Sequence, residues 1–136
     1  MRHRLDTLLR SPGLWFAARA LLAVVFLSSG LAKLIDFDGG MAEMRAAGLA
    51  PAGLVNAAVA LILAGGAVLL LLDRLVWLAA LALGGFLLLT IPVVHAFWRL
   101  PDPQAAQLAL FFALEHLSVV GGLLACAIAS RLRRGH

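Results

Sequence analysis

The chain has 136 residues, of which 63% are hydrophobic and 13% are charged, and its mean hydropathy is +1.02. This composition excludes a soluble domain, which would lack a polar surface, and it indicates an all-α integral membrane protein. The net charge of +4 comes without an aromatic, arginine-rich groove, so we expect membrane lipids and no nucleic acid at the basic ends of the chain.

The first apolar segment covers about residues 14–35 and follows Ser11-Pro12, a typical helix start. Its length suits a membrane-spanning helix, which needs about 20 apolar residues. Arg19 lies about five residues into the segment, where it either points into a helix bundle or extends to the headgroups. Four residues share one face by helical periodicity: Arg19, Phe26, Gly30 and Lys33.

Two charges, Lys33 and Asp36, close this segment in the stretch SGLAKLIDF. Their spacing of three residues allows them to pair on one helical face. Two interpretations are open. The pair is either a polar cap that ends the helix at the membrane boundary, or the mouth of a polar cavity that continues into the bundle.

The second and third segments cover about residues 51–72 and 75–98 and carry no charge inside. Only Asp73-Arg74 separates them, which predicts a tight helical hairpin. Small residues recur at a spacing of four, which favours close packing of membrane helices. These residues are Ala60 and Ala64, Ala80 and Gly84, and Ser118, Gly122 and Cys126.

The fourth segment covers about residues 103–130 and carries Glu115 and His116 near its middle. A charge at this depth costs on the order of 3 kcal/mol, so we expect Glu115 to face the bundle interior. It is either neutral, because burial disfavours its ionised form, or charged beside Arg19 or Lys33. We predict a buried ion pair between Arg19 and Glu115.

Two histidines on adjacent segments, His95 and His116, raise the question of a haem with two histidine ligands. Helix-rise arithmetic places them roughly 12–15 Å apart in depth, so we do not expect haem. Trp98 fits an aromatic anchor at the membrane interface. The single cysteine, Cys126, excludes a disulfide or CxxC site within the chain. We expect no metal site, no catalytic residue and no stand-alone enzyme.

The distribution of Lys and Arg predicts the orientation. Three cations lie on one side of the four spans: Lys33, Arg45 and Arg99. Seven lie on the other: Arg2, Arg4, Arg10, Arg74, Arg131, Arg133 and Arg134. The sequence therefore predicts one membrane domain over residues 1–136, a bundle of four transmembrane helices with both termini cytoplasmic.

Five stretches in order resemble signatures of the DoxX family of small bacterial membrane proteins. They are FLSSGLAKLIDF, MRAAGLAPAGL, LAGGAVLLL, HAFW and FFALEHLSVVGGLL. The second resembles the family's loop between its first two helices. The resemblance implies a four-helix bundle in the bacterial cytoplasmic (inner) membrane and an association with redox chemistry. Relatives include a subunit of thiosulfate:quinone oxidoreductase.

The chain departs from the family's pattern in two places. Ile62 stands where the family has an acidic residue shortly before the Gly65-Gly66 pair. Glu115-His116 stands where the family has Lys-Asn. We hypothesise that the acid has moved from the second helix to the fourth and still pairs with a cation of the first.

We therefore expect an accessory subunit of a quinone-linked redox complex that anchors a protein partner and lines a quinone pocket. One alternative is a structural assembly subunit without a ligand. Another is a stand-alone binder or transporter of a small lipophile, which would need a homo-oligomer. The readings differ in whether the polar residues converge on one cavity. The expected pocket residues are Lys33, Asp36, His95, Trp98, Glu115 and His116.

Overall fold

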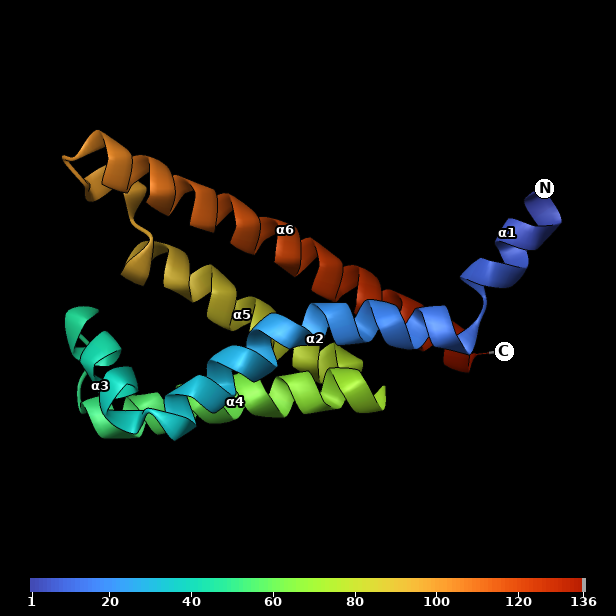
Figure 1. Ribbon diagram of the computed structural model, residues 1–136, viewed down its shortest axis with the longest axis horizontal. Helices are drawn as coiled ribbons and strands as arrows, with labels where there is room; N and C mark the ends of the chain where they lie inside the picture. The colour runs from blue at the N-terminus through green and yellow to red at the C-terminus, as the bar shows by residue number, and fades with distance from the viewer. Residues whose placement is uncertain (136) are drawn as a thin grey trace.

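The computed structural model describes residues 1–135, and every regular element in them is helical (Figure 1). Four stretches are long and apolar enough to cross a membrane: Pro12–Ile35, Ala52–Leu72, Val76–Arg99 and Pro103–Arg134. The all-α fold with four candidate spans is confirmed, and the side on which the termini lie stays a prediction. In chain order the elements are α1 (Arg2–Leu9), α2 (Pro12–Ile35), α3 (Phe37–Ala46), α4 (Ala52–Leu72), α5 (Val76–Val94), η1 (Phe97–Arg99) and α6 (Pro103–Arg134).

The boundaries of α2 and α4 agree with the predicted segments, and those of α5 and α6 differ. The α-helical part of α5 ends at Val94 rather than near residue 98. Pro92 in its last turn has no N–H to donate, and the N–H of His95 closes the helix on the carbonyls of Thr90 and Ile91. The chain then passes through η1. Helix α6 continues past the predicted end near residue 130 to Arg134. Its basic last turn suits a helix C-terminus.

Helix α3 lies between the first two spans, where the sequence predicted no helix. Gly39-Gly40 lowers the helix propensity of this stretch. The helix forms because the Asp36 side chain caps it, its Oδ1 accepting the N–H of Gly39 at 3.0 Å. Met44 is buried against the rest of the bundle. The cap and this burial offset the cost of the two glycines.

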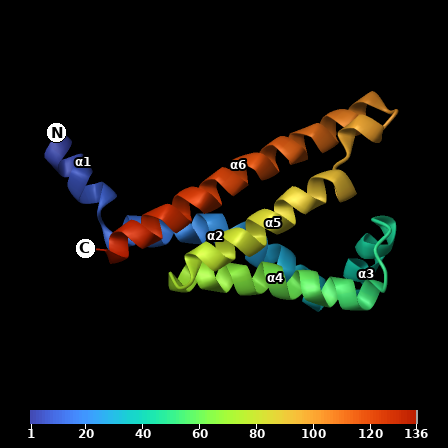
Figure 2. The same ribbon diagram turned by 180° about the vertical axis from the view of Figure 1, so that it is seen from behind.

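The four long helices form two antiparallel pairs, α2 with α4 and α5 with α6, and the short turn between α4 and α5 links them (Figures 1 and 2). Asp73 and Leu75 adopt left-handed backbone angles in that turn, so the predicted tight hairpin is confirmed. The two pairs meet at the end of the molecule near the C-terminus and diverge toward the other end. The largest fully buried side chains are Leu63, Leu70, Leu83, Leu123 and Asn56.

Small residues bring α2 and α4 into close contact, as predicted for Ala60 and Ala64. A Cβ atom on Gly30 would lie 2.8 Å from the backbone nitrogen of Ala64 and 3.1 Å from the carbonyl oxygen of Ala60. Such distances are shorter than real contacts, so only glycine fits at this crossing. The predicted face of α2 is also confirmed, because Arg19, Phe26 and Gly30 are all buried.

Candidate functional site

Polar side chains tie the helices together at the end where the two pairs meet. Asp73 caps α4, and its Oδ2 accepts the indole N–H of Trp15 at 2.9 Å. Its Oδ1 accepts the hydroxyl of Ser130 at 2.7 Å. One carboxylate therefore joins α2, α4 and α6. We call this set, with Arg19, the Asp73 network. Sequence reasoning treated Asp73 only as a turn residue.

The charge of Asp73 follows from these contacts. Partial burial by itself would raise the pKa of the carboxyl group. The hydrogen bonds from Trp15 and Ser130, with the positive charges of Arg19 and Arg134, outweigh that effect. The pKa of Asp73 therefore lies below its ordinary value, and the carboxylate is ionised at neutral pH.

Arg19 points into the bundle but does not pair with Glu115, so the predicted ion pair is corrected. Its Nη1 donates to the carbonyl oxygens of Leu70 and Leu71 at 2.9 and 2.8 Å. These are end carbonyls of α4, which carry the negative end of the helix dipole. The guanidinium also lies 5.1 Å from the ring centre of Trp15. Within residues 1–135 the one ion pair joins Lys33 to Glu43.

Lys33 and Asp36 do not pair with each other. Lys33 Nζ donates to Glu43 Oε2 on α3, while Asp36 is both the C-cap of α2 and the N-cap of α3. The interpretation of a polar cap therefore fits the structure at Asp36. An open pocket of about 220 Å³ lies beside these groups. It is lined by Ser29, Ala32, Lys33, Asp36, Gly39, Gly40 and Glu43.

Asn56 supports this corner from α4, and sequence reasoning missed it. The side chain is fully buried, and its Nδ2 donates to the carbonyl oxygen of Lys33 at 3.2 Å. A Cβ atom on Gly40 would lie 2.3 Å from Asn56 Oδ1, so only glycine fits on α3 at this contact with α4. The signal that could have found Asn56 was present, because it is the one amide side chain in an otherwise apolar segment.

His95 and His116 are in contact, with ring centres 4.9 Å apart and planes at 88°. The expected depth difference of 12–15 Å was therefore wrong. Because α5 ends at Val94 and the chain continues through η1, α6 begins beyond the end of α5 and brings His116 level with His95. The argument from depth against a haem therefore does not hold.

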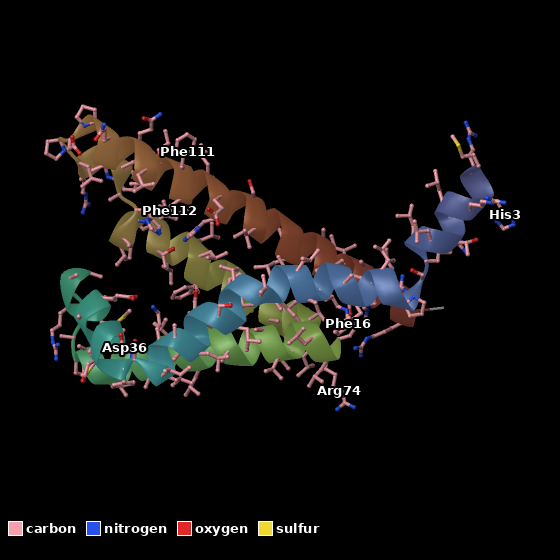
Figure 3. All side chains as sticks on the ribbon, in the orientation of Figure 1. His3, Phe16, Asp36, Arg74, Phe111 and Phe112 are labelled. Carbon is pink, nitrogen blue, oxygen red and sulfur yellow. The ribbon has the colours of Figure 1, made fainter. Side chains whose placement is uncertain are left out.

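Phe112, labelled in Figure 3, completes an aromatic cluster with the two histidines. Its ring stacks on His95 with centres 5.1 Å apart and an angle of 21°. We call His95, Phe112 and His116 the histidine cluster. Trp98 lies nearby in the chain, packed edge to face on Phe97 at 5.1 Å, and it is 54% exposed.

Glu115 is exposed, contrary to the expectation that it faces the bundle interior. It lies seven residues before Gly122 and so shares its helical face. A Cβ atom on Gly122 would lie 3.6 Å from Leu22 of α2, which places that face on the α2 side. Helix α6 diverges from α2 toward this end (Figure 1), in keeping with the exposure of Glu115. The hypothesis that it pairs with a cation of the first helix is not supported.

The expected pocket residues therefore form two groups instead of one cavity. Lys33 and Asp36 belong to the corner of α2, α3 and α4, where Figure 3 shows Asp36. The other group consists of His95 at the C-cap of α5, Trp98 in η1, and Glu115 and His116 in α6. No residue of α3 approaches α5, η1 or α6 within the described chain. The two groups come from opposite helix pairs, which diverge at this end.

Comparisons with known proteins give one result. A family model described as DoxX matches residues 14–96, more than half of the chain. The match includes Lys33, Asp36 and His95 and ends before Glu115 and His116. No curated protein and no solved structure matches the chain.

Proposed function

The chain belongs to the DoxX family, and on that premise we propose that it is an accessory membrane subunit of a quinone-linked redox complex. In this proposal α5 and α6 present the histidine cluster and Glu115 to a quinone headgroup. Lys33 and Asp36 instead organise the corner of α2, α3 and α4. The observation that carries the proposal is the contact between His95 and His116 beside a carboxyl group in an otherwise apolar span.

The chemistry of these residues fits a quinone headgroup. A quinone carries two electrons and two protons when it is reduced to a quinol. Imidazole N–H groups of His95 and His116 would donate hydrogen bonds to its carbonyl oxygens. Ionisable residues within a span are expensive and commonly serve proton transfer, a role that suits Glu115. The Phe112 ring offers a flat apolar surface beside them.

The pocket beside Lys33 supports a structural role for that corner. Its volume of about 220 Å³ is below the range of about 300–1,000 Å³ typical of sites that enclose a small organic ligand. Its lysine is already paired with Glu43, and Asp36 is used as a helix cap. We therefore propose no quinone contact there.

A partner protein would supply the electrons in this proposal. The single cysteine cannot form a dithiol, and within residues 1–135 no group of His, Cys, Asp and Glu could hold a metal ion. Quinone bound to this subunit alone would do no chemistry. The proposal thus requires a membrane-associated oxidoreductase as the partner.

Purification from native membranes in mild detergent tests both parts of the proposal. We expect a redox enzyme to copurify in fixed ratio, identified by mass spectrometry, and extractable quinone to accompany it. The double variant His95→Phe, His116→Phe keeps the ring volume and removes the donors. We expect it to retain the partner and lose about tenfold in bound quinone, the effect of two hydrogen bonds worth about 0.7 kcal/mol each.

The matched control is His3→Phe, which alters a histidine on α1, outside the bundle. It should change neither partner nor quinone. A partner with equal quinone in all variants would contradict the headgroup site and favour an assembly subunit. A homo-oligomer that contains quinone but no partner would contradict the accessory role and favour a stand-alone lipophile binder.

A purely structural assembly subunit is the second candidate, because the arrangement of α6 favours it. Helix α6 is exposed over most of its length, and its buried residues are few. A face that carries Glu115 is costly beside lipid alone. A covering helix from another subunit with a polar or basic side chain would remove that cost.

A further inference from the structure

Helix α1 stands apart from the bundle. None of its residues is buried, and it joins α2 through Arg10 and Ser11 (Figures 1 and 2). Figure 3 shows His3 projecting from it, away from the other helices. The stability of the bundle therefore does not explain why this stretch is helical.

The sequence of α1 is amphipathic. Met1, Leu5, Leu8 and Leu9 follow the spacing of one helical face, and the three leucines are 51–66% exposed. The opposite side is polar and basic, with one acidic residue, Asp6. Its other polar members are Arg2, His3, Arg4, Thr7 and Arg10. An exposed apolar stripe beside basic residues is the pattern of helices that lie in a membrane interface.

The position of α1 places that stripe at a bilayer surface. The candidate span of α2 begins at Pro12, two residues after Arg10. The last turn of α6 ends at the same level, because Arg133 Nη2 donates to the carbonyl oxygen of Arg10 at 3.0 Å. Arg131, Arg133 and Arg134 therefore lie close to the base of α1 and add to its positive charge.

We propose that α1 is an interfacial helix that lies in the headgroup layer of an anionic bilayer. Its leucines enter the boundary between headgroups and acyl chains, and its arginines bind lipid phosphates. Eight residues alone would bind weakly, but the span of α2 holds α1 at the surface, so binding is effectively intramolecular. This inference does not depend on the proposed redox role.

Spin labels on opposite faces of α1 test the orientation. In a Cys126→Ala background, one label is attached through Leu8→Cys and the other through His3→Cys, and the full chain is placed in vesicles of phosphatidylcholine and phosphatidylglycerol. We expect the label at position 8 to be accessible to oxygen and shielded from a water-soluble nickel chelate. The label at position 3 should show the reverse.

Equal access of the nickel chelate to both labels in anionic vesicles would overturn the proposal. So would shielding of position 8 that appears only after a protein partner is added, because α1 would then dock on protein. In vesicles of phosphatidylcholine alone, we expect the contrast between the two positions to fall.

A matched pair of charge variants tests lipid selectivity. Arg2→Gln with Arg4→Gln removes two charges from α1, and Arg45→Gln with Arg99→Gln removes two from the opposite end of the spans. Native mass spectrometry from mixed-lipid vesicles would count retained phosphatidylglycerol. We expect the first variant to lose roughly thirtyfold in preference for the anionic lipid, at about 1 kcal/mol for each arginine, and the second to match the wild type. Equal losses would overturn the proposal.

Discussion

Arg19 shows how a charge inside the bundle is satisfied without an opposite charge in contact. Its guanidinium carries donors in a fixed fork, and the last-turn carbonyls of α4 can accept from it, Leu70 in addition to the backbone N–H of Asp73. Two of these carbonyls accept from Nη1, and Asp73 contributes through space. Arg19 lies beside this end of α4. The carbonyl oxygens there are its partners, and Glu115 near the middle of α6 is not.

The first prediction at this scale concerns Asp73→Asn. Asparagine tolerates the left-handed backbone angles of Asp73, so the substitution changes charge and hydrogen bonding but not the turn. We expect a loss of about 1–3 kcal/mol in the free energy of unfolding, because hydrogen bonds to a charged acceptor are weakened. Unfolding in mixed micelles, followed by circular dichroism, measures it. A loss as large in Asp102→Asn, a helix cap at the other end, would contradict a specific role for the Asp73 network.

The same network predicts a dependence on pH. Because the folded pKa of Asp73 lies below its unfolded value, ionised Asp73 stabilises the protein at neutral pH. This contribution is complete above the unfolded pKa and is lost as the pH falls below about 4, toward the folded pKa. Stability of wild type and Asp73→Asn should therefore converge in acid. A constant difference across that range would contradict ionisation of Asp73.

Two double-mutant cycles test the partner of Arg19. The structure places it in the Asp73 network, whereas the sequence predicted Glu115. We predict that Arg19→Ala and Glu115→Gln have additive effects on stability, because the two side chains share no contact. Arg19→Ala and Asp73→Asn should instead couple by about 0.5–3 kcal/mol, because both belong to one network. Coupling only in the first cycle would contradict the placement of Arg19.

At the scale of elements, the crossing of α2 and α4 depends on one glycine. Gly30 faces the backbone of α4, whereas Gly65 has no neighbour within 4 Å of an added Cβ atom. We predict that Gly30→Ala lowers the free energy of unfolding by about 1–3 kcal/mol, through overpacking against a rigid backbone. Gly65→Ala should leave it unchanged or raise it by up to about 1 kcal/mol, because the added Cβ atom meets no neighbour and alanine favours the helix. Equal effects would show that the crossing is looser than the structure indicates.

Helix ends decide which residues of α5 and α6 meet. The early end of α5 at Val94 turns His95 toward His116, and the extra chain through η1 sets the register of α6. Had α5 continued straight to Trp98, the two histidines would lie at different depths. The histidine cluster is thus a product of where one helix stops, which Pro92 favours.

At the scale of the whole molecule, the two helix pairs are tied at one end and diverge at the other (Figure 2). The Asp73 network joins three helices where the pairs meet. No equivalent polar contact joins α3 to α5, η1 or α6 among residues 1–135. The face of α6 that carries Glu115 is exposed in this part of the chain.

Membrane topology supplies the prediction at this scale. In a Cys126→Ala background, Arg74→Cys and Arg99→Cys place single thiols in turns at opposite ends of the spans. The distribution of cations predicts that an impermeant thiol reagent labels position 99 in intact spheroplasts and position 74 only in inverted vesicles. The reverse pattern would contradict cytoplasmic termini. It would also move the Asp73 network to the outer surface.

The sequence by itself determined the features that depend on local pattern. Four apolar segments, the tight turn at Asp73, the small residues that meet across α2 and α4, and membership of the DoxX family were all predicted correctly. Each follows from segment length, periodicity or residue order. The bilayer favours helical spans because every backbone N–H and C=O in a spanning segment needs a hydrogen-bond partner within the protein.

The tertiary structure alone decided which polar groups meet. The side chain of Asp36 caps helix α3, and Lys33 pairs with Glu43, ten residues further along the chain. Arg19 donates hydrogen bonds to carbonyl oxygens of α4 and does not pair with Glu115. The ring of His95 contacts the ring of His116 on α6. Such contacts depend on where helices end and how they cross. Those features arise from packing between segments far apart in sequence, which no local pattern records.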